Sequence, residues 1–123
     1  MVKKLEDLRV YVIAGDIADR IWLICDKWPI FAKRTVGEQF VKAADSIGAN
    51  IAEGYGRYHY KENITFLYYA RGSLEETKFW LCQASKRDLI TNEEFTKLNK
   101  KLEELAPQLN AYIRSIGKTP SNK

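Results

Sequence analysis

Residues 95–112 read FTKLNKKLEELAPQLNAY, and the spacing of apolar residues in this stretch decides the fold class. Apolar side chains recur at steps of three and four, which places them on one face of a helix in a seven-residue, coiled-coil-like repeat. They are Phe95, Leu98, Leu102, Leu105, Leu109 and Tyr112. Thr91 and Glu94 form a capping box, a signal for a helix start. We therefore predict a helix over about 92–116, bent at Pro107.

Two segments earlier in the chain have the same periodicity. The segment 8–28 is predicted as a helix with Asp7 as its N-cap and Pro29 as its stop. Its apolar stripe comprises Val10, Ile13, Ile17, Ile21, Ile24 and Trp28. The segment 36–55 follows a second capping-box pattern, Thr35 with Glu38, and is predicted to end at two glycines. Its stripe comprises Phe40, Ala44, Ile47 and Ile51.

The segment 60–86 is the last of the four predicted helices. Its predicted apolar face comprises Phe66, Ala70, Ser73, Thr77, Leu81 and Ala84. Gly72 lies in the helix interior, where glycine costs about 1 kcal/mol relative to alanine, so we expect close packing there as the offset. The links between the four helices are short, which makes consecutive helices antiparallel neighbours. We predict an all-α, antiparallel up-down-up-down four-helix bundle, with a single domain over 1–116 and a disordered tail over 117–123.

Composition limits the functional classes. The net charge of +4, with an isoelectric point near 9.0, permits nucleic-acid contact through a local patch without requiring it. No apolar run approaches the roughly 20 residues of a membrane span, and no secretory leader is recognisable, so we expect no membrane partner and a cytoplasmic location. Cys25 and Cys82 are expected to be buried small hydrophobic residues in a reducing compartment.

Motifs for catalysis, metal binding and cofactor binding are missing from the sequence. The single histidine, His59, precedes the 60–86 helix, and we expect it to cap that helix or face solvent. The Glu-x-x-His pair of di-iron bundles, the HExxH zinc motif and the phosphate-binding glycine loop are not found. We therefore expect no catalytic residues, no metal and no cofactor, and a protein that is not an enzyme.

A polar stripe runs along the second helix at steps of four, three and four, formed by Ser46, Asn50, Glu53 and Arg57. The third helix adds Arg71, Ser73, Glu75 and Glu76. Three interpretations stand: a solvated face, a ligand site, or a buried or interfacial hydrogen-bonded network. We favour the network because Asn50 interrupts an apolar run.

Aromatic residues exceed what one thin core can hold. They cluster around the second link and third helix, at Tyr55, Tyr58, Tyr60, Tyr68, Tyr69, Phe79 and Trp80. A helix that is apolar on two sides usually packs against another subunit, which we favour. The alternative is base stacking, which uses aromatic rings beside Arg and Lys.

The stretches SIGANIAEGYGR (46–57) and FLYYARGSLEE (66–76) resemble one family along the whole chain, the 23S rRNA intervening-sequence proteins, also called four helix bundle proteins. The resemblance extends to related proteins, including the accessory variability determinant of diversity-generating retroelements. That relative is a ring-shaped homopentamer that binds nucleic acid and a reverse transcriptase. The resemblance thus implies a homo-oligomer, a pentamer by analogy, with a possible role on RNA or DNA.

The leading hypothesis is a homo-oligomeric bundle that binds RNA or DNA through basic side chains. The candidate residues are Lys33, Arg34, Lys42, Arg57, Lys61, Lys97 and Lys101. Any one of them taken alone fits a solvated, salt-bridged surface better. The second hypothesis is an adaptor that docks on a protein partner through its aromatic surface. A third hypothesis, an enzyme using the Asn50–Glu53–Arg57 and Arg71–Glu76 groups, requires them to line an open pocket.

Overall fold

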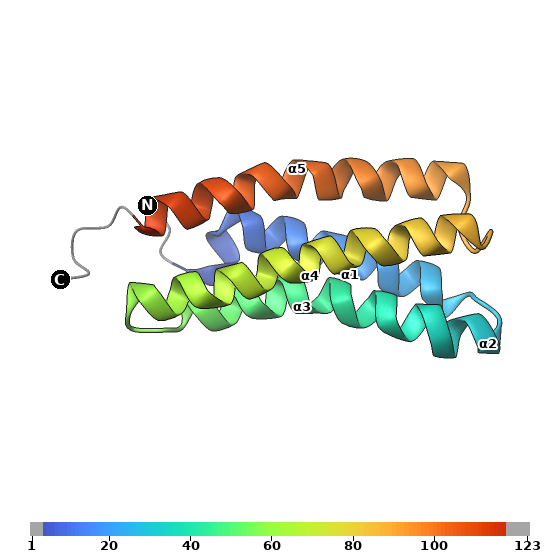
Figure 1. Cartoon of the computed structure of the whole chain (residues 1–123), viewed down its shortest axis with the longest axis horizontal. Coiled ribbons are helices and arrows are strands. Elements are labelled where there is room, and N and C mark those ends of the chain that lie inside the picture. Colours follow the sequence, from blue (N-terminus) through green and yellow to red (C-terminus); the bar gives the residue numbers. More distant parts are fainter. Residues whose placement is uncertain (1–3, 118–123) are drawn as a thin grey trace.

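The computed structural model describes residues 4–117 and has four long helices over that range (Figure 1). These are α1 (Arg9–Asp26), α3 (Glu38–Tyr55), α4 (Tyr60–Lys86) and α5 (Asn92–Gly117). Three short elements accompany them: a 3-10 turn (Leu5–Asp7), α2 (Ile30–Ala32) and a π-helical turn (Lys33–Gly37). Gly117 is the last residue of α5, and the rest of the predicted tail, 118–123, lies outside the described residues.

The four long helices run antiparallel in chain order, with the α3–α4 link at one end of the bundle and both α2 and the α4–α5 link at the other (Figure 1). Helix α1 packs mainly against α3 and α5, and α4 packs mainly against the same two helices. Helices α1 and α4 therefore lie diagonally across the bundle. The predicted all-α four-helix bundle is confirmed.

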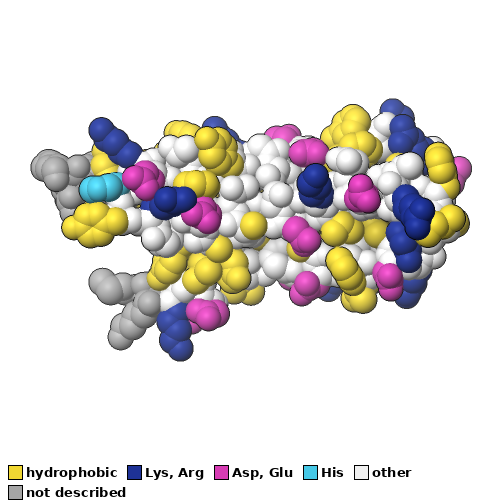
Figure 2. Space-filling model, turned by 90° about the horizontal axis from the view of Figure 1, so that it is seen from below, with side chains coloured by type: hydrophobic (Ala, Val, Ile, Leu, Met, Phe, Trp, Pro, Cys, Tyr) yellow, Lys and Arg dark blue, Asp and Glu magenta, His cyan; other side chains and the backbone are white. Residues whose placement is uncertain are grey.

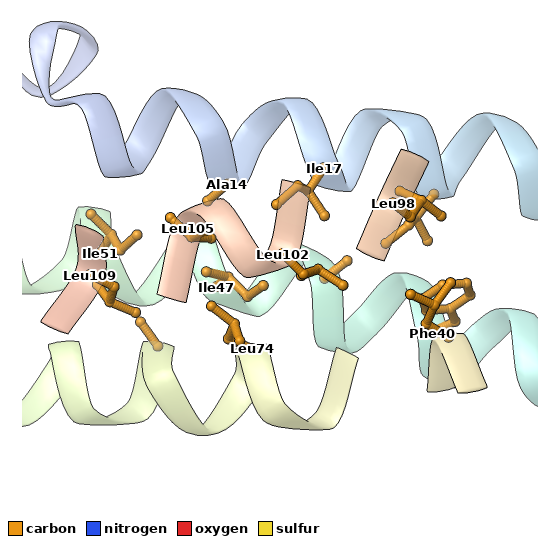
Figure 3. Packing of buried hydrophobic residues seen from close by; sticks show 14 of the residues in the cluster. Ala14, Ile17, Phe40, Ile47, Ile51, Leu74, Leu98, Leu102, Leu105 and Leu109 are labelled. Carbon is orange, nitrogen blue, oxygen red and sulfur yellow. The ribbon is translucent and has the colours of Figure 1, made fainter. Parts of the chain in front are cut away.

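The core lies along the bundle axis, where side chains from all four helices meet (Figure 3). The predicted stripe of the second helix is fully buried at Phe40, Ala44, Ile47 and Ile51. The four leucines of the heptad stretch, Leu98, Leu102, Leu105 and Leu109, are buried as well. Burial of a large aliphatic or aromatic side chain typically contributes about 1.5–3 kcal/mol, so these rows hold the helices together.

On α1 and α4 most of the predicted stripe is buried, and the buried face also extends one position to its side. The buried members of the predicted stripes are Val10, Ile17, Ile21, Trp28, Ala70, Thr77, Leu81 and Ala84. Ala14 and Cys25 are buried, while Ile13 and Ile24 are only partly buried. Likewise Leu67 and Leu74 are fully buried, whereas the predicted Phe66 and Ser73 lie at the margin. A core-facing helix buries a face more than 100° wide, so a stripe of three- and four-residue steps can trace its edge instead of its centre.

The two capping-box patterns have different outcomes. At Thr91 the box forms: the Glu94 amide donates to Thr91 Oγ1 at 3.0 Å, and the Thr91 amide donates to Glu94 Oε1 at 2.9 Å. At Thr35 the prediction is wrong, because the helix begins earlier, at Ile30, and continues through the π-helical turn into α3. Thr35 Oγ1 instead donates to the Phe31 carbonyl oxygen at 2.7 Å.

Other local expectations are also corrected. The N-cap of α1 is Leu8, without a side-chain cap, so Asp7 does not have that role. Gly54 lies inside α3 and serves close packing, whereas a Cβ at Gly72 would meet nothing within 4 Å. Cys82 is exposed, contrary to the prediction that it is buried, because its position on α4 points away from the core. No helix within residues 4–117 combines the length and apolar character that crossing a membrane requires.

Candidate nucleic-acid interface

The predicted basic residues lie in three separate places. Lys33, Arg34 and Lys42 line a cavity between α1 and the helix that runs from the π-helical turn into α3. Arg57 and Lys61 lie at the α3–α4 link, at the opposite end of the bundle. Lys97 and Lys101 lie on α5 and line a cleft together with Arg20 of α1. The structure therefore divides the predicted set instead of forming one continuous patch.

The first of these places, which we call the α1–α3 cavity, has a volume of about 490 Å³. Its lining residues are Trp22, Cys25, Asp26, Lys33, Arg34, Gly37, Glu38, Val41, Lys42 and Asp45. The Trp22 indole is 58% exposed although tryptophan is a costly side chain to leave in water. Lys33 forms an ion pair with Asp26 at 3.5 Å, whereas Arg34 and Lys42 form none with any residue in 4–117.

The π-helical turn gives this cavity its basic wall. A Cβ on Gly37 would lie 3.3 Å from the Ala32 carbonyl oxygen, 3.4 Å from the Trp28 ring and 3.7 Å from the Cβ of Cys25 on α1. The absence of a side chain at Gly37 thus lets the turn approach Trp28. Single π-helical turns inside α-helices frequently occur at functional sites, because the wider turn changes the direction of the side chains around it.

At its inner end the α1–α3 cavity meets a second cavity of about 550 Å³ along the same pair of helices, and Asp45 lines both. Small residues line much of this second cavity, among them Gly15, Ala18, Gly48 and Ala49. Burial raises the pKa of the Asp45 carboxyl above its ordinary value, and the negative charge of Asp19 raises it further.

Basic residues dominate the α1–α5 cleft, a hollow of about 280 Å³ lined by Arg20, Lys97, Lys100, Lys101 and Glu104. Asp16 accepts from Lys101 Nζ at 2.7 Å and from Arg20 Nε at 3.3 Å. These two cations hold the pKa of the Asp16 carboxyl below its ordinary value, with the Lys101 hydrogen bond the largest cause. Lys97 pairs with Glu93 at 3.4 Å, and Lys100 forms no ion pair within the described residues.

Arg57 is largely neutralised by its neighbours. Its guanidinium forms ion pairs with Glu53, one turn earlier, and with Glu62 at 3.8 Å. It also stacks over the Phe66 ring, 4.8 Å from the ring centroid. Lys61 beside it is exposed. Two carboxylates lie next to one guanidinium at this end of the bundle. It is therefore a weaker phosphate site than the α1–α3 cavity or the α1–α5 cleft.

The polar stripe does not form one connected network within residues 4–117. Ser46 Oγ donates to the Lys42 carbonyl at 2.8 Å and Asn50 Nδ2 donates to the Ser46 carbonyl at 2.9 Å, so both bond to their own helix. On α4 the Ser73 carbonyl accepts from Thr77 at 2.7 Å, and Glu76 accepts from Trp80 Nε1 at 3.2 Å.

Two of the predicted polar residues connect different helices. Arg71 of α4 donates to Asn110 of α5 at 3.1 Å and lies over the Tyr68 ring. Arg57, just after α3, pairs with Glu53 of α3 and with Glu62 of α4. The hydrogen bonds of Ser46, Asn50, Ser73 and Glu76 described above stay within single helices. The use of the stripe in a contact between subunits stays a prediction.

Sequence reasoning missed three residues of the two sites on α1. Trp22 lies outside the predicted apolar stripe of 8–28 and the predicted aromatic cluster, and Arg20 and Lys100 are not among the basic candidates. Lys100 could have been predicted from the sequence, because it is adjacent to Lys101 and lies three residues after Lys97 on the same predicted helix. The contribution of Arg20 depends on α1 lying beside α5.

The aromatic surplus is real: Tyr58, Tyr68, Tyr69 and Phe79 are exposed. Tyr68, Tyr69 and Phe79 lie on the outer side of α4, and Gly72 leaves a gap between them. His59 is exposed at the N-cap of α4, where its side chain makes no capping bond. Among residues 4–117, no three His, Cys, Asp or Glu side chains come together in a way that suits a metal ion.

The comparisons with known proteins agree on the family. Residues 6–111 match the family model described as 23S rRNA-intervening sequence protein. A crystal structure from Bacteroides thetaiotaomicron, described as a protein of unknown function from the S23 ribosomal protein family, has the same fold with a TM-score of 0.76. The two sequences are 25% identical, and the alignment covers 89% of this chain and 99% of that one.

The comparison with curated proteins gave no match. Neither the family description nor that of the solved structure names a catalysed reaction. The match to the family model covers most of the chain, from Glu6 to Ala111. The chain belongs to the 23S rRNA-intervening sequence protein family.

Proposed function

We propose that this chain is a non-enzymatic RNA-binding protein that acts as a homo-oligomer. The observation that carries the RNA-binding part is a set of cations that flank α1 and have no carboxylate partner among residues 4–117, namely Arg34 and Lys42 on one side and Lys100 on the other. A surface arginine or lysine that is already paired gains little by meeting a phosphate, whereas an unpaired one can replace condensed counterions on RNA.

On the face shown in Figure 2, which lies opposite α5, Lys and Arg side chains gather toward the end of the bundle that carries α2, with hydrophobic side chains between them. Basic groups interleaved with exposed apolar and aromatic groups are typical of proteins that bind single-stranded nucleic acid. The two sites lie on opposite sides of α1, so one strand crossing that helix can contact both.

The experiment is a titration of a short unstructured RNA with the protein at several salt concentrations. We expect the affinity to fall steeply with salt, because each phosphate contact releases counterions. The double variant Arg34→Gln/Lys42→Gln should bind more weakly and with a smaller salt slope. The matched control is Arg57→Gln, which removes a cation that already has two carboxylate partners. Binding that is absent, indifferent to salt, or equally weakened by the control would refute the proposal.

The assembly part rests on two exposed apolar faces on diagonally opposed helices. The α1 face comprises Val12 and Leu23, which are 53% and 61% exposed. The α4 face comprises Tyr68, Tyr69 and Phe79 around Gly72. Faces that differ in composition and point in opposite directions suit head-to-tail contact, and a head-to-tail contact that closes on itself makes a ring. By family resemblance we propose five subunits.

Light scattering tests the assembly. A mass near five times the 14.2 kDa of the chain is expected for the wild type. Leu23→Lys and Phe79→Lys should each lower the mass. In the proposed contact the α1 face of one subunit meets the α4 face of the next, and each substitution buries a charge on one of these two faces. The exposed Tyr58, at the α3–α4 link, offers the control Tyr58→Lys, which should keep the mass unchanged. A monomeric wild type would refute the assembly proposal.

A second candidate is a protein-interaction adaptor, which the exposed rings of the α4 face favour. Exposed aromatic side chains are enriched where proteins dock on one another. Co-purification distinguishes the two candidates. A partner protein that stays bound after nuclease treatment, and that is lost in Phe79→Lys, supports the adaptor. Retention of RNA alone, insensitive to Phe79→Lys, excludes it.

A further inference from the structure

The α1–α3 cavity has features that neither charge alone nor subunit packing explains. Its volume of about 490 Å³ lies within the range of sites for small organic ligands, roughly 300–1,000 Å³. One wall carries the exposed Trp22 indole, and the lining there also includes the apolar Cys25 and Val41. The other wall carries charges of both signs. A flat apolar ring facing a mixed polar wall suits a flat ligand that has polar edges and a charge.

Two pairs of neighbouring residues show which part of the opposite wall Trp22 lies beside. Asp26 pairs with Lys33 at one end. Asp19 and Asp45 both line the second cavity at the other end, so these two residues are also near one another. Trp22 lies between Asp19 and Asp26 on α1. Because α1 and α3 run antiparallel, it lies opposite the middle of the other wall, from Glu38 to Lys42.

The charges on that wall alternate along the helix. Arg34, Glu38 and Lys42 follow one another at four-residue steps, which places them in one row facing the cavity. The carboxylate is central and the two cations flank it. Neither Arg34 nor Lys42 has an ion-pair partner within residues 4–117, and neither does Glu38, so all three keep their capacity to bind a ligand.

We propose that the α1–α3 cavity holds one unpaired nucleotide of single-stranded RNA, with its base stacked on Trp22, an amino group of that base donating to Glu38, and its phosphates near Arg34 and Lys42. This inference deepens the RNA-binding function proposed above and rests on it. Bases without partners offer their faces to aromatic rings and their edges to polar side chains, which a paired base in a helix cannot do.

The arrangement also predicts which bases fit. Adenine, cytosine and guanine each carry an exocyclic amino group that donates hydrogen bonds, whereas uracil has none. An ionised carboxylate only accepts hydrogen bonds. Uracil offers one donor on that edge, its N3–H, between two carbonyl oxygens, so a carboxylate that accepts from it also lies against their partial negative charges. The cavity should therefore discriminate against uridine, and the neutral amide in Glu38→Gln, which both donates and accepts, should weaken that preference.

Tryptophan fluorescence is the direct measurement, with adenosine and uridine 5′-monophosphates as the probes. The Trp80→Phe background removes one of the chain's three tryptophans, and Trp28 is buried. We expect saturable quenching by the adenosine nucleotide at lower concentration than by the uridine nucleotide. In the same protein, an unstructured A-rich RNA should bind more tightly than an equally long U-rich one.

The decisive variant is Trp22→Ala, which should abolish the quenching and lower the affinity for A-rich RNA at least about fivefold, the loss expected for one stacked base. Trp22 is more than half exposed, so the variant should fold, which circular dichroism checks. Ile30→Ala is the matched control, because Ile30 is 62% exposed on the neighbouring α2 and does not line the cavity.

The outcomes are distinct. If the wild type binds RNA with the expected salt dependence but Trp22→Ala and Glu38→Gln behave like the wild type, the cavity proposal is wrong and the RNA-binding proposal stands. If neither RNA nor mononucleotides bind the wild type, both fall. If Trp22→Ala leaves RNA binding intact and lowers the solution mass instead, the cavity is a subunit contact and the nucleotide proposal is overturned.

Discussion

Gly54 of α3 packs directly against Asn63 of α4. A Cβ placed on Gly54 would lie 2.6 Å from Asn63 Oδ1 and 2.9 Å from the Asn63 carbonyl oxygen. The second of these atoms belongs to the backbone of a helix, so it cannot move away as the tip of a side chain can. The glycine of the NIAEG stretch therefore sets how closely α3 and α4 approach near their shared link.

We expect Gly54→Ala to lower the free energy of unfolding by about 1–3 kcal/mol, the usual cost of overpacking a tight contact. This outcome runs against helix propensity, which favours alanine by about 1 kcal/mol. Gly72→Ala is the matched control: it lies in the middle of a helix with open space around its Cα, so it should raise stability by about 0.5–1 kcal/mol. Urea denaturation measures both unfolding free energies. It is carried out at a protein concentration where the two variants have the same mass in solution. Equal effects of the two substitutions would contradict the packing argument.

The two threonines that precede Glu at the capping-box spacing should respond differently to alanine. Thr91→Ala removes an observed cap from the start of α5 and should cost about 1 kcal/mol of unfolding free energy. Thr35→Ala removes only a bond to the Phe31 carbonyl within a continuous helix, and such bonds slightly disfavour the helix. Its effect should be near zero or slightly stabilising. Comparable losses in thermal or urea unfolding would show that Thr35 caps a helix after all.

Lys101 should control the titration of Asp16. The pKa of Asp16 is held below its ordinary value of 3.8, first by Lys101 and then by Arg20. A carboxyl whose pKa is lower in the folded state stabilises the fold above its unfolded pKa, and this contribution is lost as the pH falls through the folded value. Lys101→Gln should therefore raise the pKa of Asp16 and destabilise the protein near neutral pH, but not at a pH below the folded pKa of Asp16.

An NMR titration of the Asp16 carboxyl measures this effect. Lys100→Gln is the control, because Lys100 lines the same cleft without an ion pair to Asp16. If both substitutions move the pKa of Asp16 equally, the general positive potential of the cleft and not the Lys101 contact is responsible.

Cys25 should resist thiol reagents until the chain unfolds. Burial against Val36 and the adjoining core raises the pKa of its thiol to about 12, so the reactive thiolate is scarce as well as inaccessible. In a Cys82→Ser variant we expect no labelling in native buffer and one label per chain in urea. In Cys25→Ser the exposed Cys82 should react with the reagent in native buffer. Native labelling of Cys25 would mean that α1 opens locally.

The long helices lie where the periodicity of apolar residues predicts them. Helix α4 has the predicted bounds, and α5 begins at its predicted capping box. The Thr35 box fails because a helix that begins at Ile30, after Pro29 at the N-cap, already satisfies the amides that a cap would serve. A local pattern does not reveal whether a preceding turn is already helical.

The candidate site is less accessible to sequence reasoning. The role of Trp22 depends on which side of α1 faces α3, and that follows from packing between residues far apart in the chain. Lys97 and Lys101 were identified from the sequence, yet their cleft exists only because Arg20 lies across from them. In contrast, the sequence predicts Arg57 both as a nucleic-acid contact and as a member of the polar stripe with Glu53, and only the structure shows the second carboxylate, Glu62, beside it.

The π-helical turn also bears on how this protein can vary in length. Its backbone hydrogen bonds span five residues where those of an α-helix span four, so the turn accommodates one residue more than an ordinary helical turn. Loss of Thr35 can therefore be absorbed by a return to regular α-helix, with little rotation of the segments on either side. Arg34 would then precede Glu38 by three residues, a spacing that still places both on one helix face, so the deletion should keep the basic wall.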